Sequence, residues 1–327
     1  MWAYRLKGPS QLELVETCSP VVQDIGDGQV LLRVLSGGIC GSDLPFFKGY
    51  GSAPAEEPAP YASTPAGFPL HEVVGEVVES RSANLPPGTD VVGWAEGSHG
   101  LAEFIVAEGN DLVPVQDALP PVKAVMAQPL ACVIGAVDRL RSVRGRTAAV
   151  LGLGPIGLLF GHVLQSRGAS YVTGVDMVDR SDVAANFGID IPVRATTERW
   201  VEGLSPSARP ELVIEAIGHQ DATFADAVTA AGFQGELYYF GIPSKHAYPF
   251  DMTAFLRKQL TLSAGTTVER RRYLLEALVY LNEYPQLADQ YVTHVVPINK
   301  VQRAYEMACR PAPGQLKITL DMQAGGK

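Results

Sequence analysis

Three glycines near the middle of the chain carry the clearest chemical signal. They form a G-x-G-x-x-G turn that follows an apolar run at 148–151 and opens a helical pattern at 156–166. The first glycine of such a turn permits the tight bend, the second lets the backbone approach a pyrophosphate, and the third lets the helix lie close to the sheet. The phosphates then meet the positive end of the helix. The sequence therefore predicts a dinucleotide site that includes Gly152, Gly154, Pro155, Ile156 and Gly157.

A carboxylate lies where such a site needs one. The next apolar run, 171–175, ends at Asp176, about 20 residues beyond the glycine turn. A carboxylate there accepts hydrogen bonds from the ribose hydroxyls of NAD and repels the 2′-phosphate of NADP. We therefore expect NAD rather than NADP. Arg180 would cover the adenine or, against the preference set by Asp176, meet a 2′-phosphate.

A second group of residues has the chemistry of a metal site. Cys40, Ser42 and Asp43 lie in one short segment, and His71 and Glu72 are adjacent further on. Thiolate, imidazole and carboxylate are zinc ligands, and a catalytic zinc keeps one position open for substrate or water. Ser42 is placed to take the proton of a zinc-bound alcohol. Asp43 would accept the other N–H of His71 and fix its tautomer.

The elements that must position these groups fall into two patterns. Up to about residue 119 the chain shows short strands broken by Gly and Pro, which indicates an antiparallel, barrel-like β domain. The strands predicted there are 12–16, 30–36, 73–79, 90–93 and 102–107. After Pro120-Pro121 strands alternate with helices, as in a doubly wound parallel α/β sheet. The later elements of this alternation are helices at 184–187 and 222–231 and strands at 212–216 and 236–240.

The end of the chain returns to the first pattern. It carries predicted helices at 268–283 and 301–309 and strands at 291–296 and 316–320. We therefore assign 1–121 and 263–327 to a catalytic domain and 122–262 to the nucleotide domain. Residues 51–69, rich in Ala, Pro and Ser, are expected to form a surface loop that serves as a lid or substrate wall.

Composition excludes several classes of protein. With 46% hydrophobic and 19% charged residues, the 327-residue chain is an ordinary globular sequence. A net charge of −9 speaks against nucleic acid as a partner. No apolar run reaches the roughly 18 residues that a membrane span needs, and the first residues do not form a signal peptide. The four cysteines are scattered without C-x-x-C spacing, so we expect a cytoplasmic location.

Taken together, these motifs resemble the medium-chain dehydrogenase/reductase superfamily, of the zinc alcohol and polyol dehydrogenase type. The resemblance covers nearly the whole chain, including 295–298, 304–306 and 316–318. It implies a Rossmann domain beside a GroES-like domain, with Cys40 and His71 as zinc ligands and Glu72 as the adjacent glutamate. It also implies that Ser42 and Asp43 form the Ser-Asp pair. The residues implied for the nicotinamide pocket are Gly218, Gly241 and Ile242.

Four departures from the family pattern bear on zinc. The ligand at the domain junction falls on Gln128, a neutral amide and a poor zinc ligand, and Leu70 replaces the glycine of G-H-E. Pro45 stands where a histidine often ends the proton relay, so Ser42 would release its proton directly. No run of four cysteines lies between Gly93 and Ala102, so the structural zinc is absent.

The sequence therefore favours a zinc-assisted, NAD-dependent oxidoreductase that interconverts a secondary alcohol and its ketone, with polyols or amino-cyclitols as candidate substrates. A zinc-free reductase of a carbonyl, an imine or an activated double bond is the alternative that Gln128 and Leu70 favour. A non-catalytic nucleotide-binding protein is a third. We expect a homodimer, with a homotetramer as the alternative, in which the apolar strand 237–242 could pair across the interface.

Overall fold

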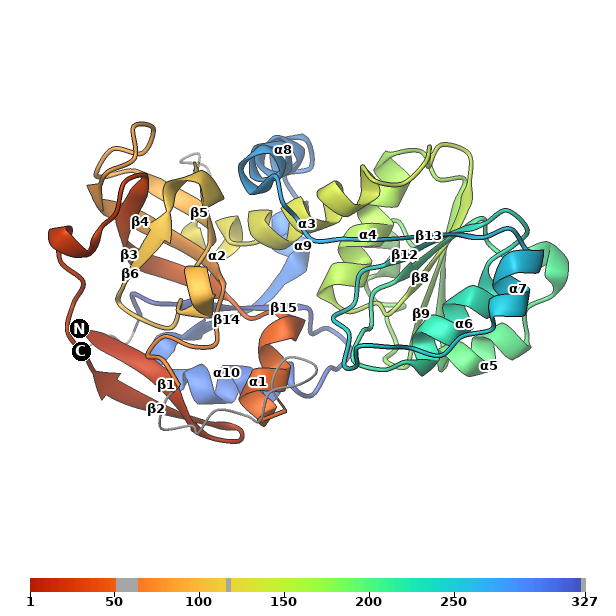
Figure 1. Ribbon diagram of the computed structural model, residues 1–327, viewed down its shortest axis with the longest axis horizontal. Coiled ribbons are helices and arrows are strands. Elements are labelled where there is room, and N and C mark those ends of the chain that lie inside the picture. The colour runs from red at the N-terminus through yellow and green to blue at the C-terminus, as the bar shows by residue number, and fades with distance from the viewer. Residues whose placement is uncertain (51–63, 116–118, 325–327) are drawn as a thin grey trace. The chain divides into compact units, whose positions relative to one another are not determined.

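The computed structural model describes residues 1–50, 64–115 and 119–324 (Figure 1). The chain divides into two compact units. Unit 1 comprises Met1–Ala131, Val268–Arg310 and Gln315–Lys327, and unit 2 comprises Cys132–Thr267 and Pro311–Gly314. No helix of the described residues is long and apolar enough to cross a membrane.

Unit 2 is built on a sheet of six parallel strands. Its strand order is β10-β9-β8-β11-β12-β13, which is the 3-2-1-4-5-6 order of a Rossmann fold. The Rossmann architecture predicted from the alternating pattern is therefore confirmed. The strands are β8 (Thr147–Leu151), β9 (Tyr171–Asp176), β10 (Ile191–Arg194), β11 (Leu212–Glu215), β12 (Glu236–Tyr239) and β13 (Thr261–Ala264).

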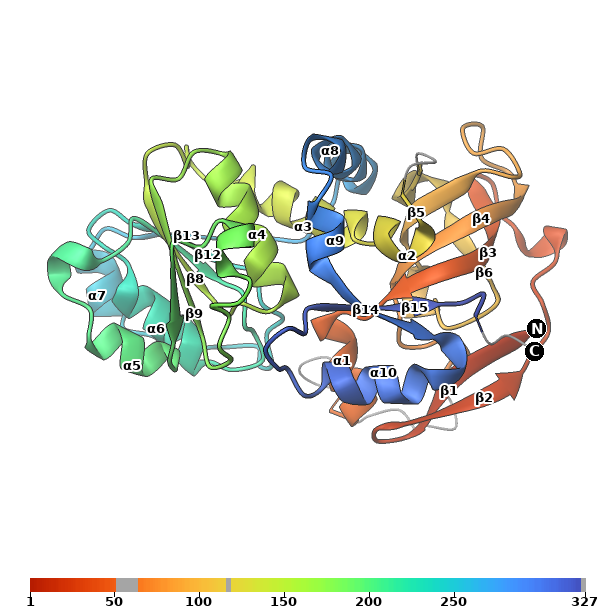
Figure 2. The same cartoon turned by 180° about the vertical axis from the view of Figure 1, so that it is seen from behind.

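Helices cover both faces of this sheet, which explains why its central strands are almost wholly apolar. Helix α4 (Pro155–Ser166) packs on β8 and β9, whereas α5 (Thr197–Glu202) and α6 (Ala222–Ala230) pack on each other over the opposite face (Figures 1 and 2). Helix α7 (Met252–Arg257) contacts α6. The strand order reverses between β8 and β11, so a crevice for a ligand is expected beyond the carboxyl ends of these two strands.

Unit 1 is a seven-stranded, mainly antiparallel sheet with a separate hairpin. The order is β14-β15-β3-β4-β5-β7, with β6 paired to β3, while β1 and β2 form the hairpin. The hairpin strands are β1 (Trp2–Gly8) and β2 (Gln11–Glu16). The sheet strands are β3 (Gln29–Gly38), β4 (Glu72–Ser80), β5 (Asp90–Trp94), β6 (Phe104–Glu108), β7 (Leu112–Pro114), β14 (Val292–Pro297) and β15 (Lys317–Asp321).

The last strand of the chain completes the sheet that the first part begins. Strand β15 pairs antiparallel with β3, with Leu320 opposite Gly37, and parallel with β14. Buried side chains of β3, β4, β6 and β15 share one hydrophobic cluster, to which Tyr305 of α10 belongs. The helices of the chain outside 132–267 are α1 (Leu44–Lys48), α2 (Pro121–Ala124), α8 (Arg270–Glu283), α9 (Leu287–Tyr291) and α10 (Val301–Ala308), and α3 (Ala127–Val137) crosses the border between the units.

The unit borders differ from those predicted. Unit 1 extends to Ala131 rather than 121, because α2 packs on β3, β4 and β15 of its sheet. At the other border, unit 2 continues to Thr267 because β13 adds a sixth strand to its sheet. Residues 311–314 also belong to unit 2, where Arg180 and Asp182 hold them by hydrogen bonds to Ala312 O and Gly314 N.

Two further expectations need correction. The segment 184–187 is a 3-10 turn, not an α-helix, and it ends at Gly188 in the left-handed region. The strand proposed for a dimer interface, 237–242, cannot pair with a second chain, because β12 is hydrogen-bonded to β11 on one side and β13 on the other. The edge strands of this sheet are β10 and β13. Most of the expected lid, 51–63, lies outside the described residues.

Candidate metal centre and nucleotide site

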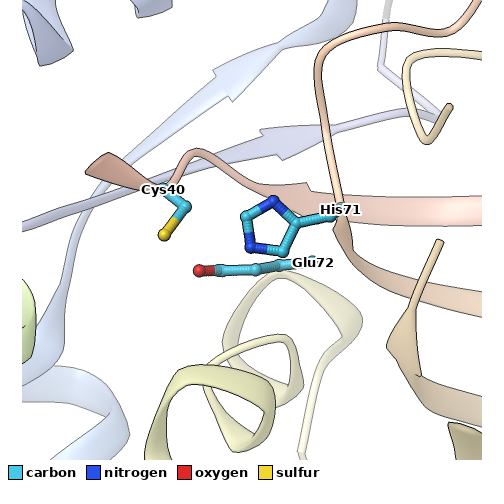
Figure 3. A group of neighbouring side chains, drawn as sticks. All are labelled: Cys40, His71 and Glu72. Atoms are coloured by element: carbon cyan, nitrogen blue, oxygen red, sulfur yellow. The ribbon is translucent and has the colours of Figure 1, made fainter. Parts of the chain in front are cut away.

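Two neighbouring strands of unit 1 bring the predicted ligands together. Cys40 follows β3, while His71 precedes β4 and Glu72 opens it, and the antiparallel register places Gly38 opposite Glu72. The ligand atoms of Cys40, His71 and Glu72 all lie within 4.8 Å of one another. Figure 3 shows the thiol and the carboxylate pointing toward each other beside the imidazole ring. Residues 31 positions apart in the chain therefore form one donor group, as the sequence predicted.

Asp43 orients the histidine. Its Oδ1 lies 2.8 Å from Nδ1 of His71, and its Oδ2 accepts a hydrogen bond from the backbone N–H of Cys40 at 2.9 Å. The carboxylate thus fixes both the ring and the thiol segment, and it leaves Nε2 of His71 available to a metal. Burial is the largest single influence and lowers the pKa of His71, but the charge and hydrogen bond of Asp43 together with those of Cys40 outweigh it and hold that pKa well above its ordinary value.

A lysine that the sequence analysis missed completes the surroundings of Glu72. Lys317 Nζ lies 2.5 Å from Glu72 Oε2 in an ion pair whose side chains are 2% and 0% exposed. The ammonium donates its hydrogen bond to Ile39 O at 2.8 Å, while neither Glu72 oxygen has a hydrogen-bond partner. Gly38 is required here, because an added Cβ would lie 2.3 Å from Glu72 Oε2. The signal in the sequence was a lysine inside the apolar strand 316–320.

Tyr305 anchors the segment that carries His71. The Tyr305 hydroxyl, fully buried, donates to Pro69 O, and burial raises the pKa of this phenol well above its ordinary value. Leu70, which stands where the family has a glycine, is buried in the unit 1 core. Its side chain fills the space next to Gly37 that a Cβ at Gly37 would occupy. Phe47 also lies in this core, with its ring centroid 5.0 Å from that of Tyr305.

The remaining predicted residues of this site lie on its flanking elements. Ser42 is half-buried in the 3-10 turn Gly41–Asp43 that connects Cys40 to α1. Gln128 is buried in the first turn of α3, and Pro45 lies in the first turn of α1. The three-residue ligand group therefore does not depend on Gln128.

The donor set fits zinc. A thiol, an imidazole nitrogen and a carboxylate oxygen are ligands that Zn²⁺ prefers, and three protein ligands are the usual number in a catalytic site. The buried Glu72 carboxylate without a hydrogen-bond donor is the kind of polar group that a cation satisfies. Cys40, His71 and Glu72 would hold the ion, and Lys317 competes with it for Glu72.

In unit 2, the glycine turn has the geometry of a phosphate cradle. Gly152 has φ +91°, which favours glycine, and an added Cβ at Gly157 would lie 1.7 Å from Gly152 O. Gly154, by contrast, has no atom within 4 Å of an added Cβ, so the space above it is open. Pro155 and Ile156 begin α4 directly after it. The helix N-terminus and the open glycine together suit a pyrophosphate.

Asp176 ends β9 beside this turn. Its Oδ2 accepts a hydrogen bond from Leu153 N and its Oδ1 from Val178 N, both at 2.7 Å. A carboxylate can accept about four hydrogen bonds, so each oxygen keeps capacity for a ribose hydroxyl. Arg180 is only 3% exposed and donates to Ala312 O, so covering an adenine would require it to move.

The residues implied for the nicotinamide pocket lie at the ends of β11 and β12. Gly218 is buried with φ +65°, and an added Cβ there would lie 2.5 Å from Ile242 N. Ile242 is 43% exposed, and Gly241 is half-buried. Sequence reasoning missed Glu215 between them, a buried carboxylate that accepts hydrogen bonds from this turn.

Two family models match the chain. One is described as the glucose dehydrogenase C-terminus and covers residues 123–319, and the other is the alcohol dehydrogenase GroES-like domain, residues 26–117. The chain belongs to the zinc-type medium-chain dehydrogenase superfamily. The family resemblance, the Rossmann and GroES-like folds and the enzyme class predicted from the sequence are thus confirmed: the protein is an alcohol dehydrogenase-type oxidoreductase.

Several named relatives are dehydrogenases of sugar alcohols. D-altritol 5-dehydrogenase of Agrobacterium fabrum is 27% identical over 86% of this chain and 88% of its own. Sorbitol dehydrogenase of Halalkalibacterium halodurans is 25% identical over the same shares of the two chains. Among solved structures, the alcohol dehydrogenase TADH from Thermus sp. ATN1 superposes with a TM-score of 0.81 at 25% identity, covering 98% of this chain and 100% of that one.

Proposed function

We propose that this enzyme interconverts a secondary alcohol of the polyol or amino-cyclitol class and its ketone, with NAD as the hydride acceptor and zinc at Cys40, His71 and Glu72. The observation that supports it most is the convergence of these three ligand atoms beside an Asp43-oriented imidazole. Named relatives that act on altritol and sorbitol support the polyol class.

The residues of unit 1 have separate tasks in this proposal. Zinc, when bound, would polarise the substrate hydroxyl and lower its pKa. Asp43 holds His71 in one tautomer, and Ser42 accepts the alcohol proton and releases it to a ribose hydroxyl or to solvent. Pro45 offers no group to extend the relay beyond Ser42. Lys317 reduces the negative charge that Glu72 offers to the metal, which weakens metal binding and makes a bound metal more electrophilic.

Asp176 supports NAD rather than NADP in this proposal. Its two oxygens accept backbone hydrogen bonds at the tip of β9 and retain capacity for the ribose hydroxyls. A phosphate in their place would meet a carboxylate of the same sign. Arg180, the nearby cation, is engaged with Ala312 O.

Metal content is the deciding measurement. We expect about one zinc per chain by plasma mass spectrometry, since the three donors form one site. Cys40→Ala and His71→Ala should lose it, and Cys309→Ala, a half-buried cysteine away from the ligands, should keep it. Oxidation of a panel of polyols with NAD and NADP then tests substrate and cofactor. Absence of zinc from wild-type protein that still binds NAD would contradict the mechanism.

One observation favours the alternative, a zinc-free reductase of a carbonyl, an imine or an activated double bond. The ammonium of Lys317 already compensates Glu72, and Gln128 adds no charge near the junction. This alternative predicts reduction with NADH or NADPH that is insensitive to chelators.

We also propose a cytoplasmic homodimer. No disulfide joins the four cysteines, all of which lie in the described residues. Strand β13 is one of the two edge strands of the unit 2 sheet, with Leu262 41% exposed, and edge strands pair readily with a second chain. Light scattering should give the mass of a dimer, and Leu262→Lys should shift it toward the monomer. An unchanged mass would exclude this edge as the interface.

A further inference from the structure

Glu215, the last residue of β11, is a carboxylate buried at the carboxyl edge of the unit 2 sheet. It is 1% exposed and accepts hydrogen bonds from Gly218 N at 3.0 Å, from Ile217 N at 3.2 Å and from the Thr223 hydroxyl at 2.8 Å. The N–H of Gly241 donates to the main-chain carbonyl of Glu215 at 3.1 Å and also acts to lower the pKa of its carboxyl. Burial raises the pKa of this carboxyl, and the donors act against that rise.

Through these contacts Glu215 ties two turns together. We call residues 216–219 and 240–242 the nicotinamide ledge. Its turns are in direct backbone contact: His219 N donates to Ile242 O at 2.7 Å, and Phe240 N donates to Glu215 O at 2.9 Å. A Cβ added to Gly241 would lie 2.3 Å from the Gly218 backbone. The Glu215 side chain therefore holds the turn 216–219, and its main-chain carbonyl holds the turn 240–242.

The direction of a bound dinucleotide places its nicotinamide half at this ledge. The pyrophosphate belongs at Gly154 and the N-terminus of α4, and the adenosine ribose belongs at Asp176, on the β9 side. The other half must then extend across the reversal point toward β11 and β12. The ledge adjoins the glycine turn, since Ile217 would contact a Cβ added to Gly152.

The charge of Glu215 is not cancelled by a cation. In the described part of the chain its hydrogen-bond partners are N–H and O–H groups of the ledge and of α6. Such dipoles stabilise the carboxylate but leave its net charge in place. The oxidised nicotinamide ring carries a positive charge and the reduced ring carries none, so a buried negative charge at this edge acts differently on the two.

We infer that Glu215 is a positioning residue that holds the nicotinamide ledge and whose charge makes the site favour NAD⁺ relative to NADH. This inference rests on the proposed use of NAD. It concerns the equilibrium between the two cofactor forms rather than the zinc site, so it holds for the zinc-free alternative as well.

Binding of both cofactor forms to the full chain tests the inference. Dissociation constants for NAD⁺ and NADH are measured by intrinsic and cofactor fluorescence for wild type, Glu215→Gln and Glu236→Gln. The last variant is the matched control: Glu236 is also 1% exposed in unit 2, but it lies at the opposite end of its strand in an ion pair with Arg146. We expect Glu215→Gln to weaken NAD⁺ binding about tenfold more than NADH binding, the effect of one charge contact of ordinary strength.

Each outcome has a distinct meaning. Equal weakening of both forms by Glu215→Gln, or the same change of ratio in Glu236→Gln, overturns the charge effect. Thr223→Val removes one donor but keeps the charge, so it should weaken both forms alike. Unchanged binding in Thr223→Val overturns the positioning role even where Glu215→Gln fails to fold. Wild-type protein that binds neither form refutes the proposed function itself, and this inference with it.

Discussion

Replacing Lys317 with Met tests whether Glu72 is shared between a lysine and a metal. The substitution keeps an unbranched apolar side chain one atom shorter than lysine and removes the cation 2.5 Å from the carboxylate. It leaves Glu72, fully buried, with neither a counter-charge nor a hydrogen-bond donor, and it removes the donor to Ile39 O. We therefore expect a strongly destabilised protein in the absence of metal.

The size of the expected loss in stability follows from the burial of Glu72 and Lys317. Removing one partner of a buried ion pair costs about 3–5 kcal/mol, because the other charge remains uncompensated. A metal that binds Glu72 supplies the missing charge, and zinc at about 1,000 times its dissociation constant stabilises the folded state by about 4 kcal/mol. Saturating zinc should thus recover most of the loss. The double variant Lys317→Met/Glu72→Gln should be more stable than Lys317→Met without metal, because no buried charge is left unpaired.

The assay is urea unfolding of the full chain with chelator or with zinc. A Trp200→Phe background confines the tryptophan signal to Trp2 and Trp94, both in unit 1. Lys300→Met is the control, since Lys300 is exposed. The reasoning would be refuted if metal-free Lys317→Met matched Lys300→Met in stability, or if zinc stabilised Lys317→Met no more than wild type.

Three further predictions separate binding from folding. Gly154→Ala should lower NAD affinity at least about tenfold in a fluorescence titration, while its stability stays within about 0.5 kcal/mol of wild type. The stability is kept because the added Cβ meets no protein atom, whereas Gly157→Ala should destabilise the fold. A Gly154→Ala variant that binds NAD normally would exclude this turn as the phosphate cradle. Gln128→Glu should raise zinc retention during dialysis because it adds a carboxylate at the junction, and Gln128→Ala is the control. Zinc retention equal to wild type in Gln128→Glu would mean that residue 128 does not reach the metal. In metal-free protein the raised pKa of His71 stabilises the fold at pH values below the ordinary histidine pKa. This stabilisation is lost as pH rises through the pKa of His71 in the folded protein, so the urea midpoint should fall over this range. Asp43→Asn should abolish this dependence of the urea midpoint on pH.

The sequence predicted those parts of the fold that leave a periodic or glycine signal. The strands 148–151 and 171–175 lie in the structure within a residue of their predicted ends, because buried parallel strands are continuous apolar runs bounded by turns. Strands β10 and β13 gave no such signal. Each of these strands has four residues and lies at an edge of the sheet. An edge strand has a neighbouring strand on one side only and is less buried, so its apolar pattern is weak. Missing β13 led directly to the wrong dimer strand.

The candidate site likewise contains residues that the sequence could predict and residues that it could not. Cys40, Asp43, His71 and Glu72 could be predicted because their side-chain chemistry is unusual and their local motifs are short. Lys317 could not be placed, because its contact with Glu72 spans most of the chain and depends on β15 joining the sheet beside β3. Glu215 was missed for a different reason: its importance lies in the backbone N–H groups that it accepts, which no side-chain pattern reveals.

These two missed residues bear on one chemical question. A zinc held by Cys40, His71 and Glu72 with Lys317 nearby experiences less negative charge than one with an additional carboxylate at position 128. Weaker donation makes the metal easier to lose and more strongly polarising while bound, which favours ionisation of the alcohol. The charge of Glu215 acts in the opposite direction on the bound cofactor, because a site that favours NAD⁺ over NADH makes bound NAD⁺ harder to reduce. The two charge arrangements therefore oppose each other at the hydride transfer, and the ratio of the two rates in Glu215→Gln should shift toward alcohol oxidation.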